Sequence, residues 1–269
     1  MSSKTDALYA EMLKKKVLSF DEIVCLARET LNQSFQGSYI YSKYISRLLK
    51  KGRLERIRRG LYVALSPIED KPSVDKFLVA SKIKPEYFLG YHTALEFHGR
   101  AYSAYNETYV CVKPESPFSP FEFGRYRFRP VFVEDLDSGV EEKIFKNSTI
   151  RVSGKERTFV DCLERIEYAG GWEEALKSLQ NLGGLDFEKV ESLTLKVGND
   201  MLLRKVGFVL ELLKKNSIFY EYLPDEILER LAARVSEQSR YLLMNTSGPL
   251  NRRWRLYIPE NFEDKHRGI

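Results

Sequence analysis

Basic side chains are concentrated between Lys43 and Arg59, a stretch that holds eight Lys and Arg residues and a single acid, Glu55. Guanidinium and ammonium groups bind phosphate oxygens, and a guanidinium can donate paired hydrogen bonds to the edge of guanine in the major groove. Ser42 and Ser46 add hydroxyl groups among these cations. The chemistry that the segment offers is therefore recognition of a nucleic acid.

The candidate contacts fall into two groups. On a helix expected from Tyr39 to Lys51, the polar side chains lie opposite the apolar face, and Arg47 is the candidate for reading guanine. The other arginines flank a hairpin turn, where they would neutralise phosphates and add affinity with little sequence information. We expect the DNA-binding residues to be Ser42, Lys43, Ser46, Arg47, Lys50, Arg53, Arg56, Arg58 and Arg59.

The elements that position these residues form a compact N-terminal pattern. A first helix is expected over Asp6–Val17, and the capping-box residues Ser19 and Glu22 open a second helix after a short break. Gln33–Ser38 is a polar loop, and Gly52 ends the third helix. Two short strands follow, Leu54–Ile57 and Leu61–Leu65, joined by Arg58-Arg59-Gly60. Three helices and a hairpin in about 65 residues are the plan of a winged helix-turn-helix, whose helix enters the major groove while the wing lies along the backbone.

A second domain is expected after the linker Ser66–Ser73, which holds two prolines and alternating charges. Helices are predicted early in this domain, then strands around a Pro- and Ser-rich loop, then helices from Glu156 onward and a closing hairpin. The fold class is therefore α+β: a winged helix-turn-helix over residues 1–66 and a mixed α/β body over residues 74–269. The body is expected to be largely helical toward its C-terminus, with a sub-boundary near residue 155. The individual predictions are helices at Val74–Ile83 and Pro85–His98, strands at Thr108–Val112, Tyr126–Val133 and Thr149–Val152, helices at Arg157–Tyr168, Trp172–Leu182, Phe187–Lys196, Asp200–Lys215 and Asp225–Glu237, and a hairpin of Tyr241–Asn245 with Trp254–Ile258.

The charge distribution separates the head from the body. Residues 1–65 carry 13 Lys and Arg against 6 Asp and Glu, so the other 204 residues carry a net charge of −2 within the overall +5. A nucleic-acid-binding head on a nearly neutral body is expected from this asymmetry. No apolar run is long enough to span a bilayer, and the N-terminus has no apolar signal core. The three cysteines have no zinc or disulfide spacing and indicate small buried residues in a reducing cytoplasm.

Four segments can be compared with a known family: LLKKGRLERIRRGLYVAL (Leu48–Leu65), YHTALEFHG (Tyr91–Gly99), SGKERTFVD (Ser153–Asp161) and NRRWRLYI (Asn251–Ile258). Together they resemble the AbiEi family of abortive-infection antitoxins and viral-defence transcriptional regulators. Leu48–Leu65, LLKKGRLERIRRGLYVAL, is similar to the family's "L-x-x-x-G-x-L-x-R-I-x-R-G-x-Y" wing. Tyr91–Gly99 resembles its "S-x-x-S-A-L-x-x-H-G" helix end, Ser153–Asp161 its "E-R-T-L-x-D" segment, and Asn251–Ile258 its closing "N-x-x-W-x-L-x-V/I". The four segments follow the family's order and span nearly the whole chain.

The resemblance implies a regulator that binds double-stranded operator DNA and represses its own operon. It also implies an antitoxin paired with a nucleotidyltransferase-like toxin encoded nearby, in a type IV toxin–antitoxin system. No enzymatic activity is expected, because the sequence offers no good candidate catalytic residues. No cofactor, metal or membrane partner is expected. No heptad pattern indicates a coiled-coil dimer, so the oligomeric state is left open.

Two other functions compete with this interpretation. Asp135 and Asp137, followed by Glu141-Glu142-Lys143, have the residue types of a D…ExK nuclease centre that holds Mg²⁺, although we expect them in a loop. Such a nuclease, or another DNA-modifying enzyme, would use the head for targeting. The remaining alternative is a winged-helix module that binds only a protein.

No other segment has the pattern of a catalytic centre. His92 and His98 lie six residues apart, which is not the spacing of a helical metal site, and His98 beside Gly99 is expected to cap a helix. His266 lies in the C-terminal tail. Asp161 is expected to hydrogen-bond a neighbouring element after a helix begins near Glu156.

Overall fold

The computed structural model describes residues 4–32, 34–68, 74–244 and 246–262. Residues 69–73 of the expected linker, together with Gln33, Asn245 and His266, therefore lie outside the described residues. The chain forms two compact units, each assembled from separate segments: Met1–Tyr87, Asn106–Phe132 and Glu142–Arg151 in the first, and Phe88–Tyr105, Val133–Glu141 and Val152–Ile269 in the second. The division at residues 66–74 stays a prediction.

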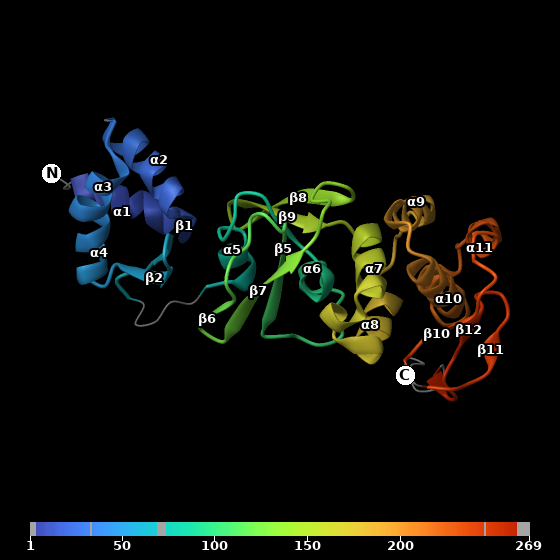
Figure 1. Cartoon of the computed structure of the whole chain (residues 1–269). Helices are drawn as coiled ribbons and strands as arrows, with labels where there is room; N and C mark the ends of the chain where they lie inside the picture. The colour runs from blue at the N-terminus through green and yellow to red at the C-terminus, as the bar shows by residue number, and fades with distance from the viewer. Residues whose placement is uncertain (1–3, 33, 69–73, 245, 263–269) are drawn as a thin grey trace. The chain divides into compact units, whose positions relative to one another are not determined.

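The N-terminal head, residues 4–65, combines helices with a small antiparallel sheet (Figure 1). Its elements are α1 (Lys4–Lys15), β1 (Val17–Ser19), α2 (Phe20–Leu31), α3 (Gly37–Ile40), α4 (Ser46–Lys50), β2 (Leu54–Arg58) and β3 (Leu61–Ala64). Leu8 and Met12 of α1 pack with Ile23 and Ala27 of α2 and with Leu48 of α4 in one buried cluster. Burial of these apolar side chains is the main force that holds the short helices in place.

The capping box predicted at the start of α2 is present. The Glu22 N–H donates to the Ser19 hydroxyl over 3.2 Å, and the Ser19 N–H donates to the Glu22 carboxylate over 2.9 Å. Two backbone N–H groups that a helix leaves without partners are thereby satisfied.

The third helix differs from the prediction in its middle turn. It begins at Gly37 within the expected loop, and a π-helical turn over Tyr41–Ile45 separates α3 from α4. The Ser46 N–H donates to the Tyr41 carbonyl five residues earlier, which is the π pattern. The helix then ends as predicted at Gly52, whose φ of +65° suits a residue without a Cβ.

The basic hairpin is formed by β2 and β3, with an irregular register between Arg56 and Arg58 and a turn at Gly60, whose φ is +80°. The sequence did not predict β1, whose three residues pair with Leu61–Val63 of β3. The resulting sheet has the order β1-β3-β2, so β3 lies in the centre.

The body contains a six-stranded sheet in the order β6-β7-β5-β4-β9-β8. Strand β5 pairs in parallel with β7, which forms an antiparallel pair with β6. The strands and the two helices that precede or follow β4 are α5 (Lys76–Ala80), β4 (Phe88–Leu89), α6 (Tyr91–Phe97), β5 (Glu107–Val112), β6 (Phe121–Phe123), β7 (Tyr126–Phe132), β8 (Val140–Phe145) and β9 (Ser148–Ser153).

Two predictions for this region were wrong. The expected helix Pro85–His98 is helical only from Tyr91, because the buried residues Phe88 and Leu89 form β4 and pair with β9. The expected loop around Glu141–Lys143 is strand β8. Every residue from Glu141 to Ile144 is exposed, so this edge strand has no alternation of apolar and polar residues to reveal it.

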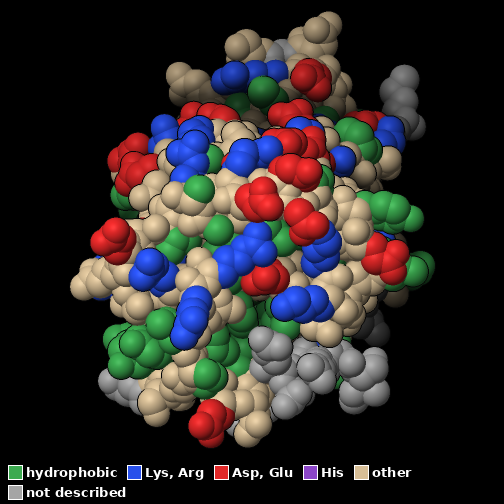
Figure 2. All heavy atoms as spheres, turned by 90° about the vertical axis from the view of Figure 1, so that its right-hand side faces the viewer, with side chains coloured by type: hydrophobic (Ala, Val, Ile, Leu, Met, Phe, Trp, Pro, Cys, Tyr) green, Lys and Arg blue, Asp and Glu red, His purple; other side chains and the backbone are tan. Residues whose placement is uncertain are grey.

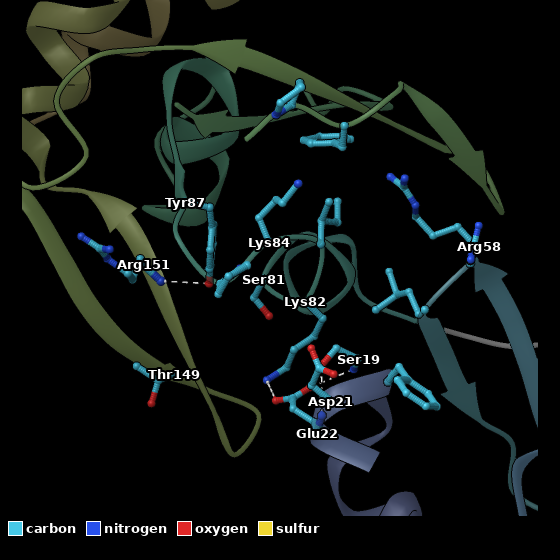
Figure 3. Close-up of a pocket in the computed structure, with 18 of the residues that line it drawn as sticks. Ser19, Asp21, Glu22, Arg58, Ser81, Lys82, Lys84, Tyr87, Thr149 and Arg151 are labelled. Atoms are coloured by element: carbon cyan, nitrogen blue, oxygen red, sulfur yellow. Dashed lines mark hydrogen bonds and ion pairs between the residues drawn. The ribbon is translucent and has the colours of Figure 1, made fainter. Parts of the chain in front are cut away.

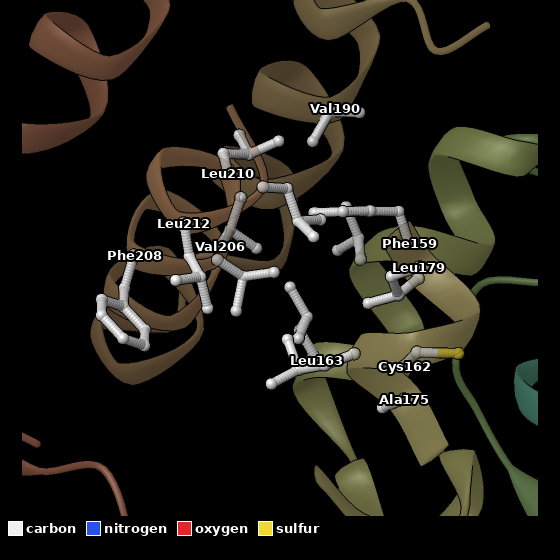
Figure 4. Packing of buried hydrophobic residues seen from close by; sticks show 14 of the residues in the cluster. Phe159, Cys162, Leu163, Ala175, Leu179, Val190, Val206, Phe208, Leu210 and Leu212 are labelled. Carbon is white, nitrogen blue, oxygen red and sulfur yellow. The ribbon is translucent and has the colours of Figure 1, made fainter. Parts of the chain in front are cut away.

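The C-terminal part is helical, as predicted. Its helices are α7 (Lys155–Glu164), α8 (Gly171–Gln180), α9 (Phe187–Val197), α10 (Asp200–Asn216) and α11 (Asp225–Ala232). Phe159 and Leu163 of α7 belong to the same buried cluster as Leu179 of α8 and Val206 of α10 (Figure 4). This cluster is the core of the second unit.

The expected closing hairpin is absent from the described residues. Instead β10 (Arg240–Tyr241) pairs in parallel with β12 (Leu256–Tyr257), and β11 (Leu250–Asn251) lies antiparallel on the other side of β12. A loop that contains Gly248 joins β10 to β11, and the carbonyl of Ile258 lies within 1.8 Å of the position that a Cβ at Gly248 would take. Glycine is therefore needed for this close backbone approach.

The motif Asn251–Trp254 attaches the end of the chain to α10. The Trp254 indole is buried, donates to Glu211 Oε2 over 2.7 Å and packs on Gly207. Arg204, also buried, donates to the backbone oxygens of Trp254 and Arg255 and forms an ion pair with Asp200. The closing motif thus has a structural role in the second unit.

Candidate nucleic-acid interface

The segment Gly37–Lys50 buries one side and exposes the other. Ile40, Tyr44, Ile45 and Leu48 face the core of the head. The side chains on the other side are exposed, apart from the half-buried Ser46; those in the predicted set are Ser42, Lys43, Ser46, Arg47 and Lys50. The five helix residues chosen from the sequence are therefore all at least partly accessible to a partner.

Three of the predicted cations are bound to neighbours within the head. Lys43 donates to the Tyr39 hydroxyl, and this hydrogen bond raises the pKa of Lys43. Arg56 donates to the Tyr41 hydroxyl over 2.6 Å, and Arg53 forms an ion pair of 2.8 Å with Asp6. These contacts hold the cations in defined positions at the surface.

Four exposed cations lack such contacts. Within the described part of the chain, no hydrogen bond or ion pair involves the side chains of Arg47, Lys50, Lys51 or Arg59. Arg47 lies on the helix and Arg59 in the hairpin turn, so both parts of the predicted interface contribute a cation without an internal carboxylate. Such groups are available to bind phosphates.

Arg58 is placed differently from its neighbour Arg59. Its guanidinium carbon lies 4.8 Å from the ring centroid of Phe121 and 5.7 Å from that of Phe118, and its Nη1 is buried. Burial lowers the pKa of Arg58 from its ordinary value. Of the two turn arginines, Arg59 is the one that is exposed.

Lys51 and two tyrosines are also exposed along the helix but were not in the predicted set. Lys51 follows α4 and is exposed, and the rings of Tyr39 and Tyr41 are 38% and 36% exposed. Lys51 could have been found from the basic run itself. Tyr41 could not, because its spacing from Ile45 and Leu48 is that of a buried helix face.

The carboxylates considered for a nuclease centre do not form a metal site within the described residues, where no group of three or more His, Cys, Asp or Glu side chains is placed to hold an ion. Asp135 instead accepts hydrogen bonds from Lys196 and from the backbone of Asp137 and Ser138. Partial burial would raise the pKa of Asp135, but these hydrogen bonds outweigh it and hold the pKa below its ordinary value. Asp135 is therefore part of a structural network.

The histidines have structural partners. His98 is the C-terminal cap of α6, as predicted, and its Nε2 lies 2.8 Å from the Ser153 carbonyl. The fully buried His92 lies 3.0 Å from Glu174 Oε1 and stacks on the Tyr105 ring. These contacts connect α6 to α8, to β9 and to the loop that follows α6.

Asp161 was expected to hydrogen-bond a neighbouring element, but among the described residues its side chain bonds within its own helix. Its Oδ1 accepts from Nε of Arg157, one turn earlier on α7, over 2.6 Å. Burial raises the pKa of Asp161 to about 6, although Arg157 opposes this shift. Arg157 also donates to the Ser138 carbonyl, so the motif Glu156–Asp161 fixes the loop before β8.

The surface over the C-terminal helices has mixed charge. Figure 2 shows Lys and Arg side chains next to Asp and Glu side chains across this face. Several are paired: Arg230 with Glu188 and Glu191, and Lys214 with Asp225. Among the residues that the structure describes, every helix is too short or too polar to cross a bilayer.

Comparisons with known proteins point to the same segment. The family model described as "Transcriptional regulator, AbiEi antitoxin" matches residues 40–64, which span most of the third helix and the hairpin. This match confirms the resemblance to the AbiEi family over that stretch. No curated protein matches the sequence.

The fold is similar to a solved structure over most of its length. The crystal structure of the RV2827C protein from Mycobacterium tuberculosis aligns with a TM-score of 0.63 over 95% of this chain and 91% of that chain. The sequences are 13% identical, so the likeness concerns the fold alone. It supports a mixed α/β fold with helices and several sheets.

Proposed function

We propose that this chain is a DNA-binding transcriptional regulator whose head is a winged helix-turn-helix. The helix Gly37–Lys50 enters the major groove of operator DNA, and the hairpin β2–β3 lies along the backbone as the wing. Arg47 reads a guanine, with Ser42, Lys43, Ser46 and Lys50 beside it. Arg53, Arg56, Arg58 and Arg59 contribute phosphate contacts.

One observation carries this proposal: four exposed cations without internal partners lie within the short segment that matches the regulator family. Arg47, Lys50, Lys51 and Arg59 are exposed and unpaired within the described residues, and three of the four lie on the helix or directly after it. An exposed cation without a carboxylate partner contributes little to the folding stability of the head. The same cation contributes substantially to DNA affinity when it contacts a phosphate.

The finer role rests on the resemblance to the AbiEi family. We propose that the chain represses its own operon and acts, without catalysis of its own, as the antitoxin of a nucleotidyltransferase-like toxin encoded nearby. The winged helix would supply repression, and the body would supply antitoxin action. Co-expression with such a toxin should restore growth, and a chain that fails to restore it would contradict the antitoxin part alone.

Fluorescence anisotropy tests DNA binding directly. Labelled duplex from upstream of the gene and a scrambled duplex of equal length are titrated with the full chain and with Arg47→Ala. We expect the wild type to prefer the upstream duplex and Arg47→Ala to lose about 1–3 kcal/mol of that preference. Unchanged preference would remove Arg47 from the interface.

The same mixtures with Mg²⁺ test the nuclease alternative. The proposal predicts intact DNA after incubation. Cleavage that Glu142→Ala abolishes would favour a nuclease and would count against the proposed function.

A further inference from the structure

A cavity of about 690 Å³ lies within the first unit, outside the proposed DNA-reading helix (Figure 3). Its walls come from the start of α2, the hairpin turn at Arg58–Leu61, the turn Ser81–Pro85 after α5, and residues of the Pro-rich loop and of β9. Pockets that enclose small molecules have volumes of about 300–1,000 Å³. The cavity is therefore large enough for a molecule of the size of a mononucleotide.

The carboxylates that line this cavity are either paired with another residue or exposed to solvent. Glu22 forms an ion pair of 2.6 Å with Lys82 and also accepts the Ser19 N–H of the capping box. Asp21 and Glu142 are exposed to solvent. No carboxylate among the described lining residues is thus committed to the remaining cations.

Four other cations line the cavity, and two of them, Lys84 and Arg58, are half-buried and have no ion pair within the described residues. Lys84 is half-buried and has no ion pair or hydrogen bond of its side chain within the described residues. The buried Nη1 of Arg58 likewise has no hydrogen-bond partner there. In Figure 3 the Lys84 ammonium and the Arg58 guanidinium point into the same space from opposite sides. Buried charged groups are normally paired, so this pair of cations is suited to an anion.

Part of the wall is apolar and aromatic. Phe20, Phe118 and Tyr87 line the cavity together with Pro85 and Pro117. The Tyr87 hydroxyl is already held, because it accepts the N–H of Arg151 over 3.2 Å. Aromatic rings can stack on a nucleotide base, and the cations beside them can bind its phosphate.

We propose that this cavity binds a small phosphate-bearing molecule of mononucleotide size, with Lys84 and Arg58 contacting the phosphate and the aromatic wall contacting the base. Arg58 belongs to the hairpin turn. If the turn contacts DNA as proposed above, the bound molecule changes the affinity for DNA; this last step rests on the proposed function, whereas the binding of the molecule does not.

Isothermal titration calorimetry on the full chain tests the site, with AMP, GMP and inorganic phosphate as probes. We expect one nucleotide to bind per chain, more tightly than phosphate alone. Lys84→Gln should weaken nucleotide binding about tenfold, which is an ordinary loss for a charge-assisted hydrogen bond. Lys84→Arg keeps the charge and should bind within about threefold of the wild type.

Lys143→Gln is the matched control, because Lys143 is exposed on β8 and does not line the cavity. Equal weakening by Lys84→Gln and Lys143→Gln would mean unspecific attraction and would overturn the proposal, as would the absence of binding for all three probes at millimolar concentration. Duplex DNA binding is measured on the same variants. Lys84→Gln should retain it, and a parallel loss would assign the cavity to DNA instead of a small molecule. Failure of the wild type to bind DNA would contradict the proposed function and leave the calorimetric result standing.

Discussion

Arg59 offers the sharpest test of the proposed wing, because it is exposed in the turn and has no internal partner among the described residues. Each phosphate contact releases counterions and adds about 0.9 to the slope of log K against log salt concentration. Arg59→Ala should therefore lower the absolute slope by about 0.9. The contribution vanishes at about 1 M salt. The contact should therefore raise the DNA affinity about fivefold at 0.15 M salt and about fifteenfold at 0.05 M.

The assay is a salt titration of anisotropy with both the upstream and the scrambled duplex. Because a phosphate contact carries no sequence information, the loss should be equal on the two duplexes. Lys143→Ala removes the same charge from an exposed position on β8 and controls for the change in net charge. It should leave the slope unchanged.

Two results would refute the reasoning. An unchanged slope for Arg59→Ala would mean that the turn does not contact the backbone. A similar change of slope for Arg59→Ala and Lys143→Ala would mean that only net charge matters, and the assignment of the hairpin as a wing would be wrong.

Three predictions concern stability, each measured by urea unfolding. Ser19→Ala removes the capping-box hydroxyl and should cost about 1 kcal/mol; no loss would mean that water replaces the cap. Gly207→Ala places a Cβ about 2.0 Å from the Trp254 ring and should cost about 1–3 kcal/mol, whereas a neutral result would show that the C-terminal segment can move away. Folding raises the pKa of Asp161 to about 6, so its contribution to stability falls as pH rises from about 4 to about 6. The Asn side chain of Asp161→Asn cannot ionise. The free energy of unfolding of this variant should therefore rise relative to that of the wild type over that range, by at most about 3 kcal/mol. A difference between the two proteins that does not vary with pH would contradict the raised pKa of Asp161 as its cause.

Local chemistry made part of the fold predictable from the sequence. The capping box at Ser19 and Glu22 and the stop at Gly52 each depend on residues within a few positions of one another. The hairpin turn at Gly60 belongs to the same class, because a positive φ is a property of one residue.

Long-range pairing explains the errors. Strand β10 pairs in parallel with β12, with each residue paired to the one 16 positions later, and no signal in the intervening sequence distinguishes this arrangement from a hairpin. Strand β4 consists of Phe88 and Leu89 only, too short for any periodicity, and it exists because β9 is available as a partner.

Because of the π-helical turn, the sequence pattern does not correctly predict which residues of the third helix are exposed. A wheel of 3.6 residues per turn places Tyr41 with Ile45 and Leu48 on the apolar face, yet Tyr41 is exposed while the other two are buried. The wider turn inserts one residue into the helix at Tyr41–Ile45, so the face before it is rotated relative to the face after it. Tyr41 is thereby brought to the surface, where its hydroxyl accepts from Arg56 of β2 and connects the helix to the hairpin. The irregular turn thus joins the helix and the hairpin of the proposed interface. Tyr41→Phe removes only the hydroxyl that connects them. The variant should weaken DNA binding if the helix and the hairpin act together, and leave it unchanged if they act independently.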